Sequence, residues 1–340
     1  MSKDAVTPTL ITVIFILFTG LYGFVKFSYE KAHVDIAHVV IPTTAEINPP
    51  ALFVPPLVDG DGIGLKKSAR PLFTYVYTES LSARVNLIFF LSNGLHDAAD
   101  FIFILNGPTN VATLIPNRSN IQVVSRSTEC SDLTVHDEIL RKDGLWKKYN
   151  RFIMLSAAVR GPFVPFWSRS CWSDVFLDRI TEDVKLVGMK ATCLPKFHIE
   201  SMILATDTIG MELLLDQPKG SSVPYTLDDH RNQVVVSGEH LSNTKQNIRG
   251  GVEATGIIKS AGYKVDIVIP SFAKIEDYEE NCAVDSVEDM TFGQQDNIHP
   301  YEAVFIKTNL DTDSDTVARL TEWHQSRIMN GSWDACHRDS

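Results

Sequence analysis

Between residues 71 and 329, short apolar runs alternate with segments of helical pattern, and this alternation constrains the fold more than any other feature. The apolar runs predict strands at Leu72–Thr78, Asp100–Leu105, Asn120–Ser125, Arg151–Val159, Val184–Met189 and Tyr263–Ile269. Strands that alternate with helices form βα units, which pack as a mostly parallel sheet with helices on its faces. The sequence therefore predicts an α/β, Rossmann-like domain over residues 71–329.

Apolar residues at helical spacing predict the segments between these strands. We expect them at Ser80–Asn93, Leu133–Tyr149, Trp172–Ile180, His198–Leu215 (an amphipathic segment), Gly251–Ala261 and Asp315–Ile328. Gly94 ends the first helix, and Ser314 or Asp315 caps the last one. The polar stretch 215–247 is long for a connection, which is typical of functional loops.

A different pattern occupies residues 8–27, which read PTLITVIFILFTGLYGFVKF with no charge before Lys26. A helix of roughly 17–20 apolar residues spans the ~30 Å hydrocarbon core of a bilayer. A cleaved signal peptide would need a small-x-small site, and none follows the run. A buried core helix is the other alternative, but a run that is apolar on every face favours a membrane span. The run therefore predicts an uncleaved transmembrane anchor in contact with the lipid bilayer.

The segments around this anchor predict a single-pass membrane protein with a lumenal C-terminal domain. Residues 1–7 form a short tail, and residues 28–70 form a stem whose prolines favour extended backbone. Residues 330–340 are expected to be a flexible tail. Asn-x-Ser sequons at Asn117 and Asn330 fit glycosylation in the lumen of the ER or Golgi, and the short anchor favours the Golgi. The charges that flank the anchor leave its orientation open.

The charge and cysteine content narrow the classes of partner. The formal net charge is -11 and basic residues are scattered, so the chain lacks the cationic surface that nucleic acid needs. The five cysteines contain no CxxC pair, which removes zinc-ribbon and thioredoxin-type sites. In a secretory compartment one or two disulfides would form; otherwise Cys130, Cys171 and Cys193 would be small core residues.

The carboxyl ends of the predicted strands are where ligands of open α/β sheets bind. This rule points to Thr78-Glu79, Asn106-Gly107, Arg126, Ser156–Phe163 and Gly188–Thr192. The sequence contains no GxSxG, HExxH or GxGxxG motif in a strand-turn-helix context, so it gives no support for a hydrolase.

Several segments of the domain resemble a group of fungal membrane-anchored proteins that are identified as glycosyltransferases. They are YVYTES, FIFILNG, KKYNRFIMLSAAVRGPF with its continuation FVPFWSRSCW, VKLVGM and HIESMILATDTIG, spread between residues 75 and 323. The group is distantly similar to rhamnan-synthesis enzymes and to other nucleotide-sugar-dependent enzymes of the GT-A fold. The resemblance therefore implies a GT-A-like domain, a nucleotide-sugar donor and a glycan or glycoconjugate acceptor.

The resemblance does not decide whether the donor site uses a divalent metal ion. A nucleotide-sugar donor has a diphosphate leaving group, whose growing charge needs a metal ion or cationic side chains. Many GT-A enzymes carry Asp-x-Asp after a central strand for Mn²⁺ or Mg²⁺, but here the matching strand ends in Leu155-Ser156-Ala157. The Asp-x-Asp matches at 59–61 and 311–313 lie in the stem and before the last helix, where solvated turns explain them. No residue is therefore assigned to a metal.

The resemblance also suggests residues for the donor. Arg160, with Gly161 in a Gly-Pro loop, would hold a diphosphate without metal; the alternative is that it caps the loop or pairs with a carboxylate. Asp132 lies where the resembling enzymes often place a donor-binding Asp, although an N-cap explains it equally well. Asn106 and Gly188 complete the expected donor site, since Asn106 directly follows a predicted strand and Gly188 lies at the carboxyl end of another.

Two residues are candidates for the catalytic groups. Glu253 resembles the glutamate that faces the acceptor in GT-A enzymes, although a helix start also favours a carboxylate electrostatically. His299, in NIHPYE, resembles the C-terminal His that often closes such donor sites, and a structural His is the alternative. His198 and Glu200 belong to a motif of the group, without an assigned role.

The sequence thus predicts a membrane-anchored glycosyltransferase of the secretory pathway. The alternative is a pseudoenzyme or lumenal binding protein that keeps the GT-A scaffold, because the missing Asp-x-Asp removes a common catalytic element. Donor affinity without sugar transfer would identify this alternative.

Overall fold

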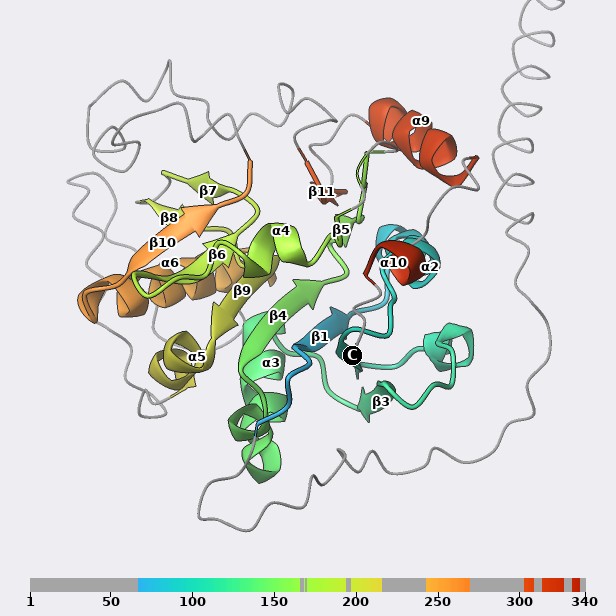
Figure 1. Cartoon of the computed structure of the whole chain (residues 1–340). Helices are drawn as coiled ribbons and strands as arrows, with labels where there is room; N and C mark the ends of the chain where they lie inside the picture. The colour runs from blue at the N-terminus through green and yellow to red at the C-terminus, as the bar shows by residue number, and fades with distance from the viewer. Residues whose placement is uncertain are drawn as a thin grey trace, which may run out of the picture. The chain divides into compact units, whose positions relative to one another are not determined.

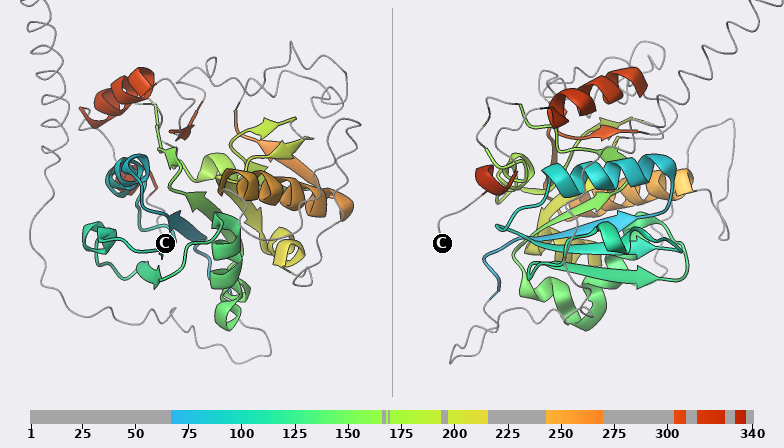
Figure 2. Two further views of the ribbon diagram at one scale, coloured as in Figure 1. Left: turned by 180° about the vertical axis from the view of Figure 1, so that it is seen from behind. Right: turned by 90° about the vertical axis from the view of Figure 1, so that its right-hand side faces the viewer.

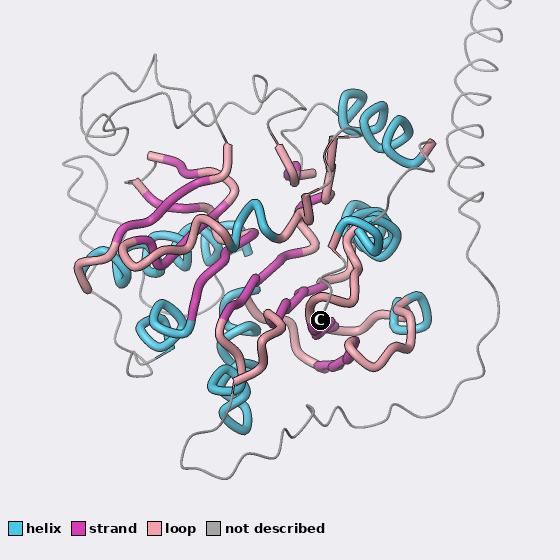
Figure 3. The backbone as a smooth tube through the Cα atoms, in the orientation of Figure 1, coloured by secondary structure: helices cyan, strands magenta, loops and turns pink. Residues whose placement is uncertain are grey.

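A computed structural model describes residues 67–165, 168, 170–193, 197–215, 243–269, 303–308, 314–326 and 332–336 (Figures 1 and 3). The expected anchor at residues 8–27 lies outside these ranges. None of the helices within them is long and apolar enough to cross a membrane.

The centre of the domain is a seven-stranded sheet with the order β10-β6-β9-β4-β1-β2-β3. Its strands are β1 (Leu72–Tyr77), β2 (Asp100–Asn106), β3 (Ile121–Arg126), β4 (Arg151–Ser156), β6 (Val184–Gly188), β9 (Ile203–Asp207) and β10 (Lys264–Ile267). All neighbouring pairs are parallel except those of β9, which runs antiparallel to both β4 and β6. The expected α/β architecture with a mostly parallel sheet is confirmed, and it fits a Rossmann-like fold.

Helices cover both faces of this sheet (Figure 2). Those described are α2 (Leu81–Asn93), α3 (Asp132–Arg141), α4 (Asp174–Leu177), α5 (Thr208–Leu215), α6 (Asn243–Ser260), α9 (Ser314–Gln325) and α10 (Ser332–Ala335), with short 3₁₀ turns η2 (Val111–Leu114) and η3 (Lys142–Lys148). Tyr75 of β1 packs on Phe90 of α2, with ring centroids 4.9 Å apart, whereas Thr74 Oγ1 lies 2.8 Å from His136 Nδ1 of α3. Because successive strand side chains point to opposite faces, α2 and α3 lie on opposite sides of the sheet.

An aromatic cluster fills the face of the sheet that α2 covers. The ring of Phe73 lies 5.2 Å from that of Phe101 and 5.5 Å from that of Trp172, measured between centroids. Trp172 in turn contacts Phe305 at 5.3 Å. All four side chains are almost completely buried. The cluster therefore joins β1 and β2 to two segments that are far away in the chain.

The C-terminal residues 332–336 pack against the same side of the domain. Cys336 forms a disulfide with Cys171, 165 residues earlier in the chain. The Ser332 hydroxyl donates a hydrogen bond to the Asn93 carbonyl at the end of α2. We expected a flexible tail over residues 330–340, and for residues 332–336 this disulfide and packing give a fixed position instead.

The expected amphipathic segment His198–Leu215 is three elements rather than one. It consists of β8 (His198–Ile199), the antiparallel strand β9 and the helix α5, and β8 pairs with β7 (Ala191–Thr192). The side chains of residues 203–205 of β9 are completely buried. A buried strand carries apolar residues on both faces, so its pattern merges with that of the helix that follows.

Three other elements are shorter than expected. The helix expected over Leu133–Tyr149 breaks after Arg141, where positive φ angles at Asp143 (53°) and Gly144 (62°) turn the chain into η3. The strand expected over Arg151–Val159 ends at Ser156, because β5 (Val159–Arg160) leaves the sheet and pairs antiparallel with β11 (Ile306–Lys307). The third is α4, which is a single turn.

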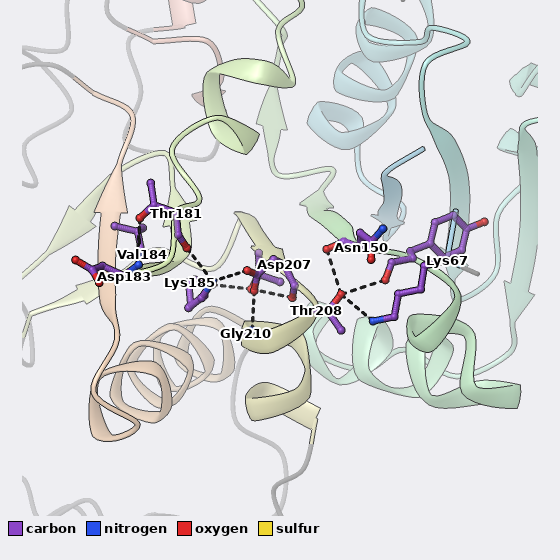
Figure 4. A network of polar contacts seen from close by, with 11 residues as sticks. Lys67, Asn150, Thr181, Asp183, Val184, Lys185, Asp207, Thr208 and Gly210 are labelled. Atoms are coloured by element: carbon purple, nitrogen blue, oxygen red, sulfur yellow. Dashed lines mark hydrogen bonds and ion pairs between the residues drawn. The ribbon is translucent and has the colours of Figure 1, made fainter. Parts of the chain in front are cut away.

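A buried ion pair closes the amino edge of the sheet (Figure 4). Lys185 Nζ lies 2.6 Å from Asp207 Oδ2 and donates to the Thr181 carbonyl at 2.8 Å. The other carboxylate oxygen, Asp207 Oδ1, accepts from the Gly210 N–H at 2.9 Å. The Lys185 and Asp207 side chains are 5% and 21% exposed. Both oxygens of Asp207 are thus used to join β6, β9 and the start of α5.

We predict that Lys185→Met lowers the free energy of unfolding by about 3–5 kcal/mol, because it leaves the largely buried Asp207 carboxylate without its cation. Urea unfolding measures this loss. Lys264→Met is the matched control, since its 3.7 Å pair with Asp183 is about three-quarters exposed and is expected to change stability by less than about 0.5 kcal/mol. Equal losses for the two variants would contradict a buried pair at Lys185.

His136 gives the domain a specific pH dependence. Complete burial lowers the pKa of His136 to about 3, and only a backbone interaction with Leu155 opposes this shift. The unfolded chain takes up the proton near pH ~6.5, so the stability contribution is complete above that pH. It falls by about 1.4 kcal/mol per pH unit as the pH drops from ~6.5 towards 3. Urea unfolding of His136→Gln across this range should show a flatter dependence than the wild type; identical slopes would show that His136 is not a buried neutral group.

Candidate functional site

The carboxyl ends of β1 and β4 flank the point where the order of the parallel strands reverses. From β1 the chain proceeds to β2 and β3 on one side, and it then returns to β4 on the other side of β1. Val76 of β1 is paired with Ser156 of β4 in this register. Helices on opposite faces diverge at such a switch point, which is where open α/β sheets bind ligands.

Asp132 lies at this switch point. It is the first residue of α3, whose N-cap Ser131 makes no side-chain capping bond. The Asp132 side chain is partly exposed, yet enough protein surrounds it that desolvation raises the pKa of its carboxyl group, while a hydrogen-bonding interaction with Ser156 opposes the rise. The arrangement presents a carboxylate beside the end of β4, at a place that solvent reaches.

Asn106 fixes the loop that leads to Asp132. Its Nδ2 donates to Thr78 Oγ1 at 2.9 Å and to the Cys130 carbonyl at 2.8 Å, and its Oδ1 accepts from the Cys130 N–H at 3.2 Å. Gly107 has a φ of 108°, and a Cβ there would meet Glu129 at 2.6 Å. Asn106 was expected to contact the donor. Instead, its side chain bonds protein groups and joins the ends of β1 and β2 to the segment before α3. It therefore supports the site by fixing this loop.

A polar cluster follows β1 at Glu79, one of the strand ends to which the sequence pointed, although its partners were not expected. Arg84 on α2 donates to both oxygens of the Glu79 carboxylate, at 3.1 and 2.8 Å, and to Asn110 Oδ1 at 2.7 Å. Desolvation by itself would raise the pKa of the Glu79 carboxyl group. Hydrogen bonds from Thr109 and Arg84 outweigh it, so the pKa of Glu79 is lowered overall. Burial, with Glu79 nearby, raises the pKa of Tyr77 to about 12. An ionised Glu79 beside a neutral Tyr77 therefore marks the end of β1.

Arg160 lies on β5, beyond the end of β4. Its Nε donates to Asn86 Oδ1 at 2.9 Å, and its Nη1 donates to Thr321 Oγ1 of α9 at 3.1 Å. Desolvation lowers the pKa of Arg160, and no carboxylate among the described residues pairs with it. A Cβ at Gly161 would lie 2.5 Å from the Val304 carbonyl oxygen, so only glycine fits there. Arg160 thus holds α9 against α2 through neutral partners.

The remaining expected site residues are spread along the carboxyl edge or lie outside the described ranges. Gly188 ends β6, where a Cβ would meet Ile199 at 2.1 Å, so protein fills the space beside it. Glu253 is half-buried on α6, one turn after Gly250, whose position contacts Leu133 at the start of α3. His299 and the sequon residue Asn330 lie outside the described residues. Asn117, the other sequon residue, is exposed.

The described residues do not provide a metal site at the switch point. β4 ends in Ser156 and the following two residues are alanines, as the sequence indicated. In the part of the chain that the structure describes, the one group of His, Cys, Asp or Glu atoms that converge is His96, Cys171 and Cys336, in which the two cysteines form the disulfide. The Asp-x-Asp matches at 59–61 and 311–313 lie outside the described ranges.

Comparison with known proteins gives distant structural neighbours. No protein-family model and no curated protein sequence matches the chain. A mannosyltransferase, PcManGT from Pyrobaculum calidifontis in complex with GDP-Man and Mn²⁺, is similar over 60% of this chain and 56% of that chain, with 11% identity and a TM-score of 0.37. A cytidylyltransferase from Leptospira borgpetersenii serovar Hardjo-bovis is similar over 58% of this chain and 74% of that chain, with 9% identity and a TM-score of 0.31. The similarity thus spans just over half the length of the mannosyltransferase.

Proposed function

We propose that this protein transfers a sugar from a nucleotide-sugar donor, and that the donor binds at the carboxyl ends of β1 and β4. The observation that carries the proposal is the position of Asp132, a partly exposed carboxylate at the switch point beside Ser156. The sequence segments that resemble membrane-anchored glycosyltransferases support the same reading. The acceptor in this proposal is a glycan or glycoconjugate.

Asp132 suits the nucleoside part of such a donor. A carboxylate accepts hydrogen bonds and repels phosphate, so its partners would be N–H groups of the base or hydroxyls of the ribose. α3 begins at Asp132, and a helix start favours negative charge, which acts with Ser156 against the rise in pKa that desolvation causes. In this proposal Asn106 acts indirectly, by fixing the loop that positions Asp132.

Arg160 is the proposed partner of the diphosphate. Within the described residues its charge has no counter-ion, and two of its N–H groups bond neutral oxygens. A guanidinium has five N–H donors in a planar fork, so Arg160 can hold Asn86 and Thr321 and still donate to a phosphate. The described residues do not fit a divalent cation, so the proposed partner of the diphosphate is Arg160 rather than a metal ion.

Transfer would break the bond between the anomeric carbon and the phosphate oxygen, and would release the nucleoside diphosphate. The acceptor oxygen bonds to the same carbon and loses its proton to a base. Glu253 on α6 and His299 are the proposed catalytic groups, on the resemblance described above. The packing of α6 against the start of α3, where a Cβ at Gly250 would meet Leu133, supports the choice of Glu253.

The proposed setting is the lumen of the ER or Golgi, with residues 8–27 as the membrane anchor. Two features of the domain support an oxidising compartment. Cys171 pairs with Cys336, and Cys193 is also disulfide-bonded, while Cys130 is free. The exposed position of Asn117 is compatible with N-glycosylation.

The alternative function is a non-catalytic scaffold that binds a nucleotide sugar. The observation that favours it is the sequence at the end of β4, where Ser156 and the two alanines that follow carry no carboxylate of their own. Such a protein would keep the Asp132 contact and donor affinity, but would release no nucleoside diphosphate in the presence of acceptors.

The proposal predicts that one class of nucleotide sugar raises the thermal unfolding temperature of the full-length chain. A ligand at a hundred times its Kd stabilises the folded state by about 2.7 kcal/mol. Asp132→Asn should weaken that ligand roughly 10-fold, because a charge-assisted hydrogen bond becomes a neutral one. A panel of UDP- and GDP-sugars, followed by titration of the ligand that binds, measures both effects.

Asp137→Asn is the matched control, since it lies on the same helix and pairs with Arg141 at the surface. It should bind the ligand as the wild type does. Absence of any nucleotide-dependent stabilisation would reject the proposed function, and equal effects of the two variants would reject the role of Asp132.

A further inference from the structure

A second buried ion pair lies at the carboxyl edge of the sheet, outside the residues assigned above. Lys190 follows the end of β6, and Glu200 follows β8. Lys190 Nζ lies 3.1 Å from Glu200 Oε1, and the two side chains are 5% and 17% exposed. The Glu200 N–H also donates to the Lys190 carbonyl at 3.1 Å, so the pair closes the β7–β8 hairpin.

One oxygen of this pair is left without a partner. Glu200 Oε2 is buried, and no described residue donates a hydrogen bond to it. Leaving a buried carboxylate oxygen unsatisfied is costly, since water no longer solvates it. The oxygen can therefore accept a hydrogen bond from a group that the described residues do not supply.

The ion pair at the amino edge differs from this one in the partners of its carboxylate oxygens. Asp207 has one oxygen on Lys185 and the other on the Gly210 N–H, so its carboxylate is fully used. Glu200 has the same type of partner, a lysine that is 5% exposed, but no described residue acts as a second donor. A pair that served stability alone would be expected to satisfy both oxygens, as Asp207 does.

The position of Glu200 relates it to the candidate donor site. The Met202 carbonyl, two residues after Glu200, accepts from the Ser156 N–H at 2.9 Å. Ser156 is the residue that interacts with Asp132. Glu200 and Asp132 therefore lie along one edge of the sheet, on either side of the end of β4.

The chemistry of the pair defines the ligand group. A carboxylate repels phosphate and accepts from N–H or O–H donors. Lys190 fixes the orientation of the carboxylate, because its ammonium group is itself buried. Next to a nucleotide-sugar site, the neutral group that is rich in O–H donors is the sugar.

We propose that Glu200 binds a hydroxyl of the donor sugar through Oε2, with Lys190 as its positioning residue. This inference rests on the proposed function, and it adds a specificity contact for the part of the donor that is transferred. Nucleotide sugars that lack a matching hydroxyl, and nucleoside diphosphates without sugar, would not use it.

The test compares the affinity of the full-length chain for UDP and GDP with that for the corresponding UDP- and GDP-sugars. In the wild type, one nucleotide sugar should bind more tightly than its bare nucleoside diphosphate. Glu200→Gln should lower the affinity for that nucleotide sugar roughly 10-fold, the scale of one charge-assisted hydrogen bond, and leave the affinity for the bare nucleoside diphosphate unchanged. The double variant Lys190→Gln with Glu200→Gln removes the carboxylate without leaving a buried lysine unpaired, so it covers the case in which the single variant does not fold.

The outcomes separate this inference from the proposed function. If these variants bind the nucleotide sugar as tightly as the wild type, Glu200 has no sugar contact, while the proposed function stands. If they lose the bare nucleoside diphosphate equally, Glu200 acts on the fold or the nucleotide and the inference is also overturned. If the wild type binds no member of the panel, the proposed function fails and this inference falls with it.

Discussion

The parallel pairing of β4 with β1 is the constraint on which the rest of the site depends. It places Ser156 next to the end of β1, although the chain between them has already built β2 and β3 on the other side. The connection back to β4 must therefore cross the sheet, and α3 makes this crossing on the face opposite α2. As a result, the first residue of α3, Asp132, arrives at the carboxyl edge beside Ser156. The position of this carboxylate follows from the topology of the sheet.

The two edges of the sheet use buried charge in different ways. At the amino edge, Lys185 and Asp207 satisfy each other and the start of α5, and the network stays within the protein. At the carboxyl edge, Asp132 is partly exposed and Glu200 has a buried oxygen that no described residue reaches. Functional sites are where proteins retain groups that their own fold does not satisfy. The unpartnered oxygen of Glu200 therefore supports the proposed ligand site at the carboxyl edge.

The sequence predicted the parallel strands well because each is a short apolar run bounded by turn residues. It missed β9, because Ile203 and its buried neighbours precede the apolar helix α5 without a turn signal, and a short apolar run fits either structure. The break after Arg141 was also missed, since the apolar spacing continues through a turn that Gly144 permits. In both places the apolar pattern fits more than one secondary structure, and tertiary packing decides which one forms.

For the candidate site, the rule that ligands bind at strand ends pointed to Ser156, and the resemblance pointed to Asp132. The sequence could not predict which side chains the residues of the site would contact. Arg160 bonds Asn86 and Thr321, which are 74 and 161 residues away in the chain. Glu200 stands out only because its two carboxylate oxygens differ in their surroundings, and this difference requires coordinates. Composition and spacing cannot encode such contacts between distant segments.

The most direct test of a ligand site at the β1–β4 switch point is hydrogen exchange of the full-length chain with and without a nucleotide sugar. A ligand bound at this switch point should slow amide exchange in residues 78–80, 127–133 and 156–158, which surround the carboxyl ends of β1 and β4. The amino edge around Lys185 and Asp207 should exchange as before. Protection confined to the amino edge, or to segments away from both strands, would contradict the account.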